Sequence, residues 1–229
     1  MSTAKATKSL NKNPLILYHG NKDKNMLPEY NKGKADNDYG RGFYTTTDLQ
    51  LAKEWAWSGY SNGDKAYVHC YELDIRGLNI LDFTKLDSVH WVAELLQNRT
   101  FGNLIEVSEI GKENAELLKK KYKLDTDNYD IIIGYRADDS YFSYAVDFVT
   151  GQIYRETLDK ALHCGSLGLQ VFIKSKRAFD RLNFISVEEV PKKFETDFKN
   201  RDVRARNEYK DIKRSNKSIK RTSITDYIK

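Results

Sequence analysis

The sequence predicts an α+β domain with a small, split, mostly antiparallel β-sheet and flanking helices. Short apolar runs with β-branched and aromatic residues recur along the chain and stop at glycine or polar residues, as strands do. Segments with helical periodicity lie between them. The two kinds of segment do not alternate regularly, as they would in a doubly wound parallel sheet.

The first expected strand is "PLILYHG", residues 14–20, a buried apolar run that ends at glycine. Residues 21–37 are polar and form a long predicted loop, and loops of this length inside compact domains are usually functional. A strand at 43–46 follows. Asp48 is then expected to cap a helix through "LQLAKEWAWSGY".

Further strands are expected at residues 65–74 and 78–83, and a helix at 87–99 begins with an aspartate cap. "YDIIIG", residues 129–134, has the pattern of a fully buried strand. Two helices are expected next, at 141–149 and at 155–165, and Gly165 would stop the second. A late strand occupies "LGLQVFIKS", and a short turn and "RLNFISVEEV" follow it.

Composition indicates an ordinary cytoplasmic protein. The 229 residues are 40% hydrophobic and 31% charged, and no apolar stretch approaches the length of a membrane span, so no membrane partner is expected. The N-terminus lacks the apolar region of a secretory signal. Cys70 and Cys164 lie far apart, which favours a reducing compartment, and the four histidines show no metal-ligand spacing.

The net charge of +5 is unevenly distributed. Residues 191–229 contain 13 Lys/Arg and 6 Asp/Glu, a net +7, whereas residues 1–190 carry a net −2. We therefore expect a flexible N-terminus at 1–13, a domain at 14–190 and a basic, helical C-terminal tail at 191–229. The tail is either a solvated helix or a surface for an anionic partner, a nucleic acid or an acidic protein.

Several enzyme signatures are absent. The chain has no phosphate-binding P-loop, no G-x-G-x-x-G after a strand and no G-x-S-x-G nucleophile elbow. A lone histidine at a strand end is usually structural, and a lone tyrosine is usually a core aromatic. The combination of "LYHG" with "DYGRGFYTTTD" about two dozen residues later is more informative than either residue alone.

This combination resembles the ADP-ribosyltransferase superfamily, in the His-Tyr-Glu branch of diphtheria toxin and the poly-ADP-ribose polymerases. Within that branch the chain is similar to a bacterial family known mainly as a domain of unknown function. That family shares "LYHG", "DYGRGFYTTTD", the "ADD" of "YDIIIGYRADD" and the Gln-x-x-F pattern of "LQVFIKS". The resemblance spans about residues 15–184 and implies an ADP-ribosyltransferase-like fold.

The resemblance also implies roles for single residues, with NAD as the substrate. His19 would hydrogen-bond a ribose hydroxyl, the backbone of Gly20 would bond the nicotinamide carboxamide, and the Tyr44 ring would stack on the nicotinamide. Gly40 and Gly42 would allow the turn into the strand, and Arg41 is placed to meet a phosphate. Phe43 and Thr46 complete the expected NAD-binding set.

Gln170 stands where the branch carries its glutamate. An amide can hydrogen-bond a ribose hydroxyl, but it neither supplies negative charge nor accepts a proton. Asp138 and Asp139 follow a buried strand, so they either cap the next helix or supply the missing acid. The candidate catalytic residues are therefore His19, Tyr44, Gln170 and Asp139.

We expect an NAD-dependent mono-ADP-ribosyltransferase, of the glycosyltransferase class, that modifies a protein or nucleic acid. The family's company implies a toxin of a toxin–antitoxin or phage-defence pair, with a small antitoxin protein as a further partner. Two alternatives stay open: an NAD glycohydrolase, and a catalytically inactive binding module of the same fold that acts through its basic tail.

Overall fold

The computed structural model describes residues 12–58, 65–99, 108–137, 139–166, 168–215 and 221–229. Its strands are β1 (Leu15–Asn21), β2 (Phe43–Thr45), β3 (Tyr67–Leu73), β4 (Ile80–Asp82), β5 (Ile131–Tyr135), β6 (Leu169–Ile173) and β7 (Leu182–Glu189). Its α-helices are α2 (Leu49–Ala56), α3 (Ser88–Asn98), α4 (Glu109–Tyr122), α5 (Asp139–Val149), α6 (Arg155–Ala161), α7 (Lys176–Phe179), α8 (Lys193–Ser215) and α9 (Ile224–Ile228). Short 3-10 turns occupy η1 (Phe83–Lys85) and η3 (Cys164–Ser166). The fold is α+β, as the sequence predicts.

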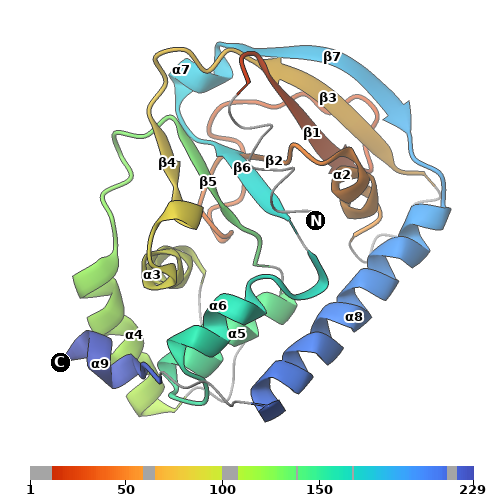
Figure 1. Cartoon of the computed structure of the whole chain (residues 1–229). Coiled ribbons are helices and arrows are strands. Elements are labelled where there is room, and N and C mark those ends of the chain that lie inside the picture. The colour runs from red at the N-terminus through yellow and green to blue at the C-terminus, as the bar shows by residue number, and fades with distance from the viewer. Residues whose placement is uncertain (1–11, 59–64, 100–107, 138, 167, 216–220) are drawn as a thin grey trace.

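The strands form two sheets, ordered β1-β3-β7 and β2-β6-β5-β4 (Figure 1). All neighbours pair antiparallel except β4 and β5, which are parallel. The sheets share an apolar core: Leu17 and Tyr71 contribute from the first, Ile133 and Val171 from the second. Alternate residues of each strand point into this core, which is why the strands read as apolar runs with β-branched residues.

An isolated β-bridge joins the two sheets where they split. The backbone N–H of Tyr18 donates to the carbonyl of Thr46 at 2.8 Å, and the N–H of Thr46 donates back to Tyr18 at 3.0 Å. This bridge lies one residue from the end of β2 and in the middle of β1. It therefore brings the His-Gly end of β1 beside the Phe-Tyr strand β2.

Helices cover the outer faces of both sheets. Helix α2 packs on the three-stranded sheet, and Gly20 makes this possible, because a Cβ there would lie 2.2 Å from the carbonyl oxygen of Ala52. Helices α3, α5 and α6 lie on the side of the four-stranded sheet (Figure 1), and Trp91, Phe148 and Leu158 from these helices are buried in the core beneath them. Asp48 caps α2 as predicted, since its carboxylate accepts the N–H groups of Gln50 and Leu51.

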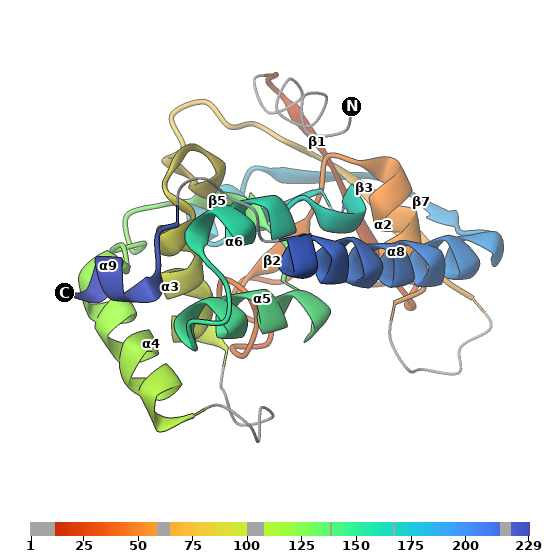
Figure 2. The same cartoon turned by 60° about the horizontal axis from the view of Figure 1, so that its bottom comes forward.

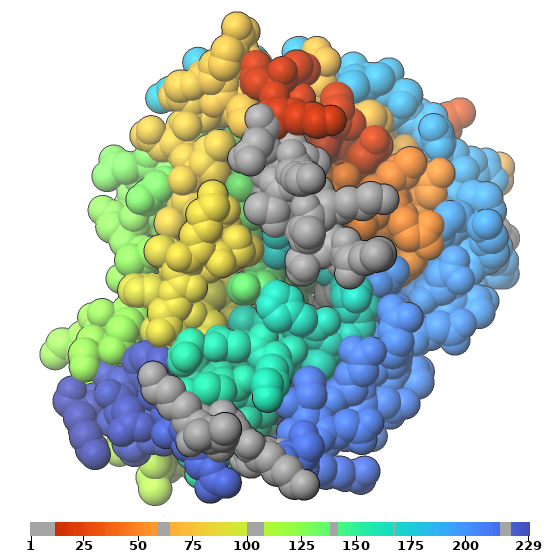
Figure 3. Space-filling view, viewed as in Figure 1, coloured from red at the N-terminus to blue at the C-terminus, as the bar shows by residue number. Residues whose placement is uncertain are grey.

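The C-terminal segment packs on the rest of the domain. Helix α8 runs beside α2 and α6 (Figures 2 and 3) and buries Phe194, Ala205 and Tyr209. Helix α9 lies against α4, where Lys121 donates to the carbonyl oxygen of Tyr227 at 2.6 Å. Basic side chains of residues 191–229 also contact the domain: Arg201 and Arg204 donate to the Gly165 carbonyl, and Lys213 donates to the Asp147 carboxylate.

The expected elements differ from the structure mainly at their ends. Helix α6 stops at Ala161, before Gly165, which instead takes a left-handed conformation (φ 62°) inside η3. Helices α4 and α7 were not among the expected elements. Among the described residues, none of the helices has the length and apolar character needed to cross a membrane.

Candidate functional site

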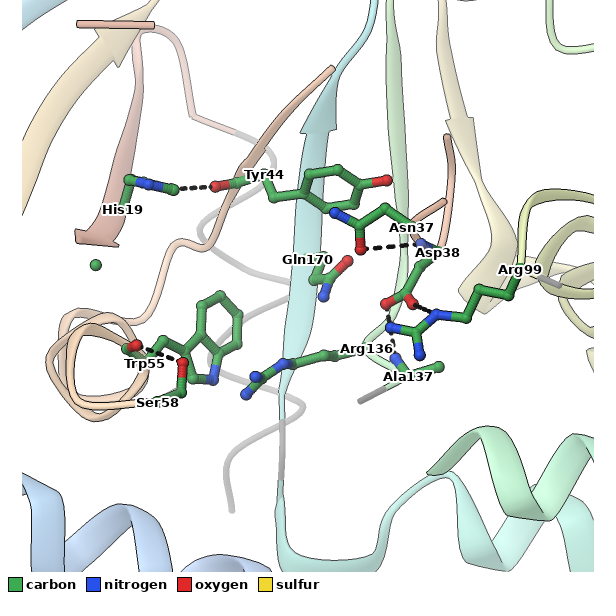
Figure 4. A pocket seen from close by; sticks show the side chains of 11 residues that line it. His19, Asn37, Asp38, Tyr44, Trp55, Ser58, Arg99, Arg136, Ala137 and Gln170 are labelled. Carbon is green, nitrogen blue, oxygen red and sulfur yellow. Dashed lines mark hydrogen bonds and ion pairs between the residues drawn. The ribbon is translucent and has the colours of Figure 1, made fainter. Parts of the chain in front are cut away.

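A pocket of about 260 Å³ opens where the two sheets separate. Four of the residues that the sequence singled out line it: His19, Gly20, Tyr44 and Gln170. They come from β1, β2 and β6, strands that are far apart in sequence (Figure 4). The split sheet therefore brings these four residues to one place.

The imidazole of His19 is held in one tautomer. Its Nδ1 lies 2.7 Å from the carbonyl oxygen of Tyr44, and because a carbonyl only accepts, Nδ1 carries the proton. Nε2 is then an acceptor, which Asn21 approaches weakly at 3.4 Å. Burial lowers the pKa of His19 to about 4, so at neutral pH the ring is uncharged and offers a lone pair.

The phenol of Tyr44 is fixed at its far end. Its hydroxyl donates to the carbonyl of Gly40 at 2.7 Å and accepts the N–H of Tyr39 at 2.9 Å. Gly40 has φ +77°, a conformation that glycine adopts without strain. The ring packs on Phe172, and burial raises the pKa of Tyr44, so the hydroxyl stays protonated. The turn before β2 therefore orients the aromatic ring.

Gln170 carries an unused polar atom. The side chain is 6% exposed, and its Oε1 has no hydrogen-bond partner among the described residues. A buried, unsatisfied amide oxygen costs free energy of about 1–3 kcal/mol. Its position on the pocket wall gives this cost a reason, since a ligand with a hydroxyl or N–H donor would satisfy it (Figure 4).

The opposite side of the pocket carries charge. Asp38 is 1% exposed, its Oδ1 lies 2.7 Å from Nε of Arg99, and its Oδ2 accepts the N–H of Ala137 at 2.8 Å. Burial, which outweighs the nearby guanidinium groups, raises the pKa of Asp38 to about 6. Arg136 lies over the Trp55 ring at 4.7 Å. With two arginines and one aspartate, these lining residues favour an anionic ligand.

The remaining residues of the predicted set lie elsewhere. Arg41 is exposed and donates weakly to the carbonyl of Asn31. Phe43 belongs to the core between the sheets, and the buried Thr46 hydroxyl accepts the N–H of Asp48. At Gly42 a Cβ would meet the Phe172 ring at 2.3 Å, so this glycine serves packing.

The two aspartates after β5 give less information. Asp139 begins α5, but its side chain is outside the part of the molecule that the structure describes, and Asp138 lies outside the described residues altogether. Neither the capping interpretation nor the acid interpretation is therefore tested.

Seven lining residues were not singled out from the sequence: Asn37, Asp38, Trp55, Ser58, Arg99, Arg136 and Ala137. Asp38 stands inside the "DYGRGFYTTTD" block, so its place in that motif could have identified it as a candidate site residue. Arg136 likewise precedes the "ADD" motif. Trp55 fits the apolar face of α2, and Arg99 is the residue that follows α3, so nothing local marks either as a pocket residue.

The fold and the site define an α+β protein with a polar, arginine-lined pocket at the split of its sheet. A family model described as "Protein of unknown function (DUF3990)" matches residues 15–184, which is 170 of the 229 residues. The chain belongs to this family. No curated protein and no solved structure matches it.

Proposed function

We propose that this protein binds NAD in the pocket and transfers a single ADP-ribose to a macromolecular acceptor. The observation that carries the proposal is the gathering of His19, Gly20, Tyr44 and Gln170 in one pocket. The resemblance to ADP-ribosyltransferases rests on sequence motifs alone, and motifs need not meet in space. The convergence of these four residues in one pocket supports the proposal beyond the motif match itself.

The reaction breaks the bond between the nicotinamide nitrogen and the ribose. The bonding pair leaves with the nitrogen, which turns the cationic pyridinium into neutral nicotinamide, and positive charge develops on the ribose ring. An acceptor nucleophile then bonds to the anomeric carbon and loses its proton. The protein has to fix the ribose, hold the ring and stabilise the charge as it moves.

The side chains present suit these tasks. Nε2 of His19, which has a long contact with Asn21, can accept from a ribose hydroxyl, and Oε1 of Gln170 can accept from another. The Tyr44 ring offers an aromatic face to the cationic nicotinamide. The cavity has room for one end of the dinucleotide, so the other end would lie along its mouth.

The phosphate role assigned to Arg41 from the sequence fits Arg136 better. Arg136 lines the pocket beside Trp55, whereas Arg41 is exposed outside it. A guanidinium at the pocket can bond two phosphate oxygens at once. The exposed Arg41 would reach only a part of the ligand that leaves the pocket.

Single transfer is favoured because Gln170 is neutral. Chain growth requires a carboxylate that activates a ribose hydroxyl of the acceptor, and an amide cannot do this. Among the lining residues Asp38 is the one carboxylate, and it is engaged with Arg99 and Ala137.

The setting implied by the resemblance is that of a toxin in a toxin–antitoxin or phage-defence pair.

The test is nicotinamide release from NAD by the purified protein, with and without cell lysate as the source of acceptor. His19→Ala and Tyr44→Ala are the test variants, and Tyr30→Ala, an exposed tyrosine outside the pocket lining, is the matched control. We expect release that needs lysate, that is lost in both pocket variants and that survives in the control.

Other outcomes separate the alternatives. Release without lysate would indicate an NAD glycohydrolase. No release in any condition, from protein that is folded by circular dichroism, would contradict NAD chemistry and leave a binding module. In that case the effect in cells would depend on residues 191–229 and not on the pocket.

A further inference from the structure

The guanidinium of Arg201, on α8, is inserted between two segments of the domain. It forms a bidentate pair with Glu54 of α2, in which Nη2 donates to Oε1 at 2.8 Å and Nε donates to Oε2. The Glu54 side chain is 1% exposed and the Arg201 side chain 16%. A buried, bidentate pair of this kind is geometrically specific, unlike an ion pair on the surface.

The same guanidinium holds the segment that leads into β6. Its Nη1 donates to the carbonyl oxygens of Gly165 at 3.0 Å and Ser166 at 2.9 Å. The N–H of Gly165 donates in turn to Glu208 of α8 at 2.6 Å, and Arg204 reaches the Gly165 carbonyl at 3.2 Å. Side chains of α8 thus bond both the N–H and the carbonyl group of Gly165.

Both attachment points adjoin the pocket. Glu54 is the residue before Trp55 on α2, and Ser166 lies four residues before Gln170 on β6. The two segments also touch directly, because a Cβ on Gly168 would lie 2.2 Å from Cδ1 of Leu51. Helix α8 runs beside α2 (Figures 1 and 2), and it also packs on η3, the turn that precedes β6.

We propose that Arg201 is a positioning residue: it sets the separation of the pocket walls that carry Trp55 and Gln170 by tying α2 and the Gly165–Ser166 turn to one guanidinium. One arginine of the basic C-terminal segment thereby acts on the pocket without touching a ligand. The kinetic part of the test rests on the proposed function, but the structural part does not.

Lysine cannot replace Arg201 in this role. A single ammonium can meet one oxygen of Glu54 or the two carbonyls, but it cannot span both with a fixed geometry. Arg201→Lys keeps the charge and most of the side chain, so it tests the geometry. Arg206→Ala is the matched control, because Arg206 is exposed on the same helix and pairs with Asp202, one helical turn away.

The experiment uses full-length protein labelled with 5-fluorotryptophan. The fluorine signals of Trp55, Trp57 and Trp91 are assigned by replacing each tryptophan in turn with phenylalanine. Trp55 reports on the pocket, and Trp91, a fully buried residue of α3, reports on the global fold. We expect Arg201→Ala and Arg201→Lys to move or broaden the Trp55 signal, Arg206→Ala to leave it in place, and all three to leave Trp91 unchanged.

The same variants are assayed for nicotinamide release. A displaced wall should lower kcat/KM by roughly 10-fold or more in both Arg201 variants, while Arg206→Ala stays within about twofold. If Arg201→Ala does not fold, as the Trp91 signal will reveal, Arg201→Lys decides. An unchanged Trp55 signal in Arg201→Lys overturns the proposal. Should the wild type release no nicotinamide, the proposed function fails while the fluorine spectra still decide this inference.

Discussion

The Nδ1 proton of His19 is donated to the carbonyl oxygen of Tyr44 over 2.7 Å, which links the two sheets at the pocket. The bond crosses the split beside the Tyr18–Thr46 bridge, so the histidine and the tyrosine keep a fixed relation to each other. It also determines which histidine nitrogen faces a ligand.

Acidification should destabilise the protein through His19. The folded pKa of about 4 lies below the ordinary 6.5, so the unfolded chain binds the proton first as the pH falls. The stability contributed by the neutral ring is full above pH 6.5 and declines toward pH 4, by up to roughly 3 kcal/mol. Urea unfolding of the wild type and of His19→Gln at pH 4, 5.5 and 7 measures this. A stability difference between the two that does not vary with pH contradicts it.

The effect of Asp38 on the pH dependence of stability should have the opposite sign to that of His19. Its folded pKa of about 6 is raised above the ordinary 3.8, so its ionisation lowers stability as the pH rises from 4 to above 6. Asp38→Asn removes this titration. We expect the stability of the variant, relative to the wild type, to improve by up to about 3 kcal/mol between pH 4 and pH 7. If the relative stability of Asp38→Asn instead falls between pH 4 and pH 7, the pair with Arg99 outweighs the desolvation of Asp38.

Gln170→Glu should accelerate nicotinamide release. A carboxylate at this position would stabilise the positive charge that develops on the ribose, which the amide cannot do. Because the site is buried, the new carboxyl should have a raised pKa, so the gain should appear at pH 8 and fade at pH 5. Rates at both pH values measure this, with Gln170→Ala as the control that removes the amide. Equal rates for Gln170→Glu and the wild type at pH 8 would be evidence against a cation beside Gln170.

Arg136→Ala should weaken NAD binding, and Arg41→Ala should not. Both changes remove one positive charge, but only Arg136 lines the pocket. We expect KM for NAD to rise by roughly 10-fold in Arg136→Ala, the loss of a charge-assisted hydrogen bond. A larger effect in Arg41→Ala would return the phosphate role to that residue.

Gly42→Ala should destabilise the fold more than Gly151→Ala does. A Cβ at position 42 would lie 2.3 Å from the Phe172 ring and 2.6 Å from the carbonyl oxygen of Ile173. At Gly151 nothing lies within 4 Å, and only the left-handed backbone (φ +74°) opposes alanine, at a cost of about 1–2 kcal/mol. The midpoints of urea unfolding compare the two. Equal losses of stability in the two variants would mean that the core around Phe172 rearranges to accept a Cβ at little cost.

The sequence predicts the strands well because they are apolar and end at glycine or polar residues. It misses α4 because that helix buries only Gly111, Ala115 and Leu118, too few and too small to leave an apolar stripe. Helix α7 has four residues and no periodicity to detect. Gly165 was expected to end a helix, but its left-handed conformation serves the turn that Arg201 holds.

The residues of the pocket also divide into those that the sequence can identify and those that it cannot. His19, Gly20 and Tyr44 lie in motifs with unusual local chemistry, so they can be found from the sequence. Trp55 and Arg99 reach the pocket only through the packing of α2 and α3, which no local pattern specifies. Arg201 is harder still, because in the sequence it is one base among many in a charged helix.

The proposed function depends first of all on the binding of NAD to the pocket. Isothermal titration calorimetry of the purified protein with NAD, repeated with His19→Ala and with Tyr30→Ala, requires no acceptor and no turnover. We expect saturable binding at one site in the wild type and in Tyr30→Ala, and its loss in His19→Ala. Binding that is equal in all three proteins, or absent from the folded wild type, would contradict it.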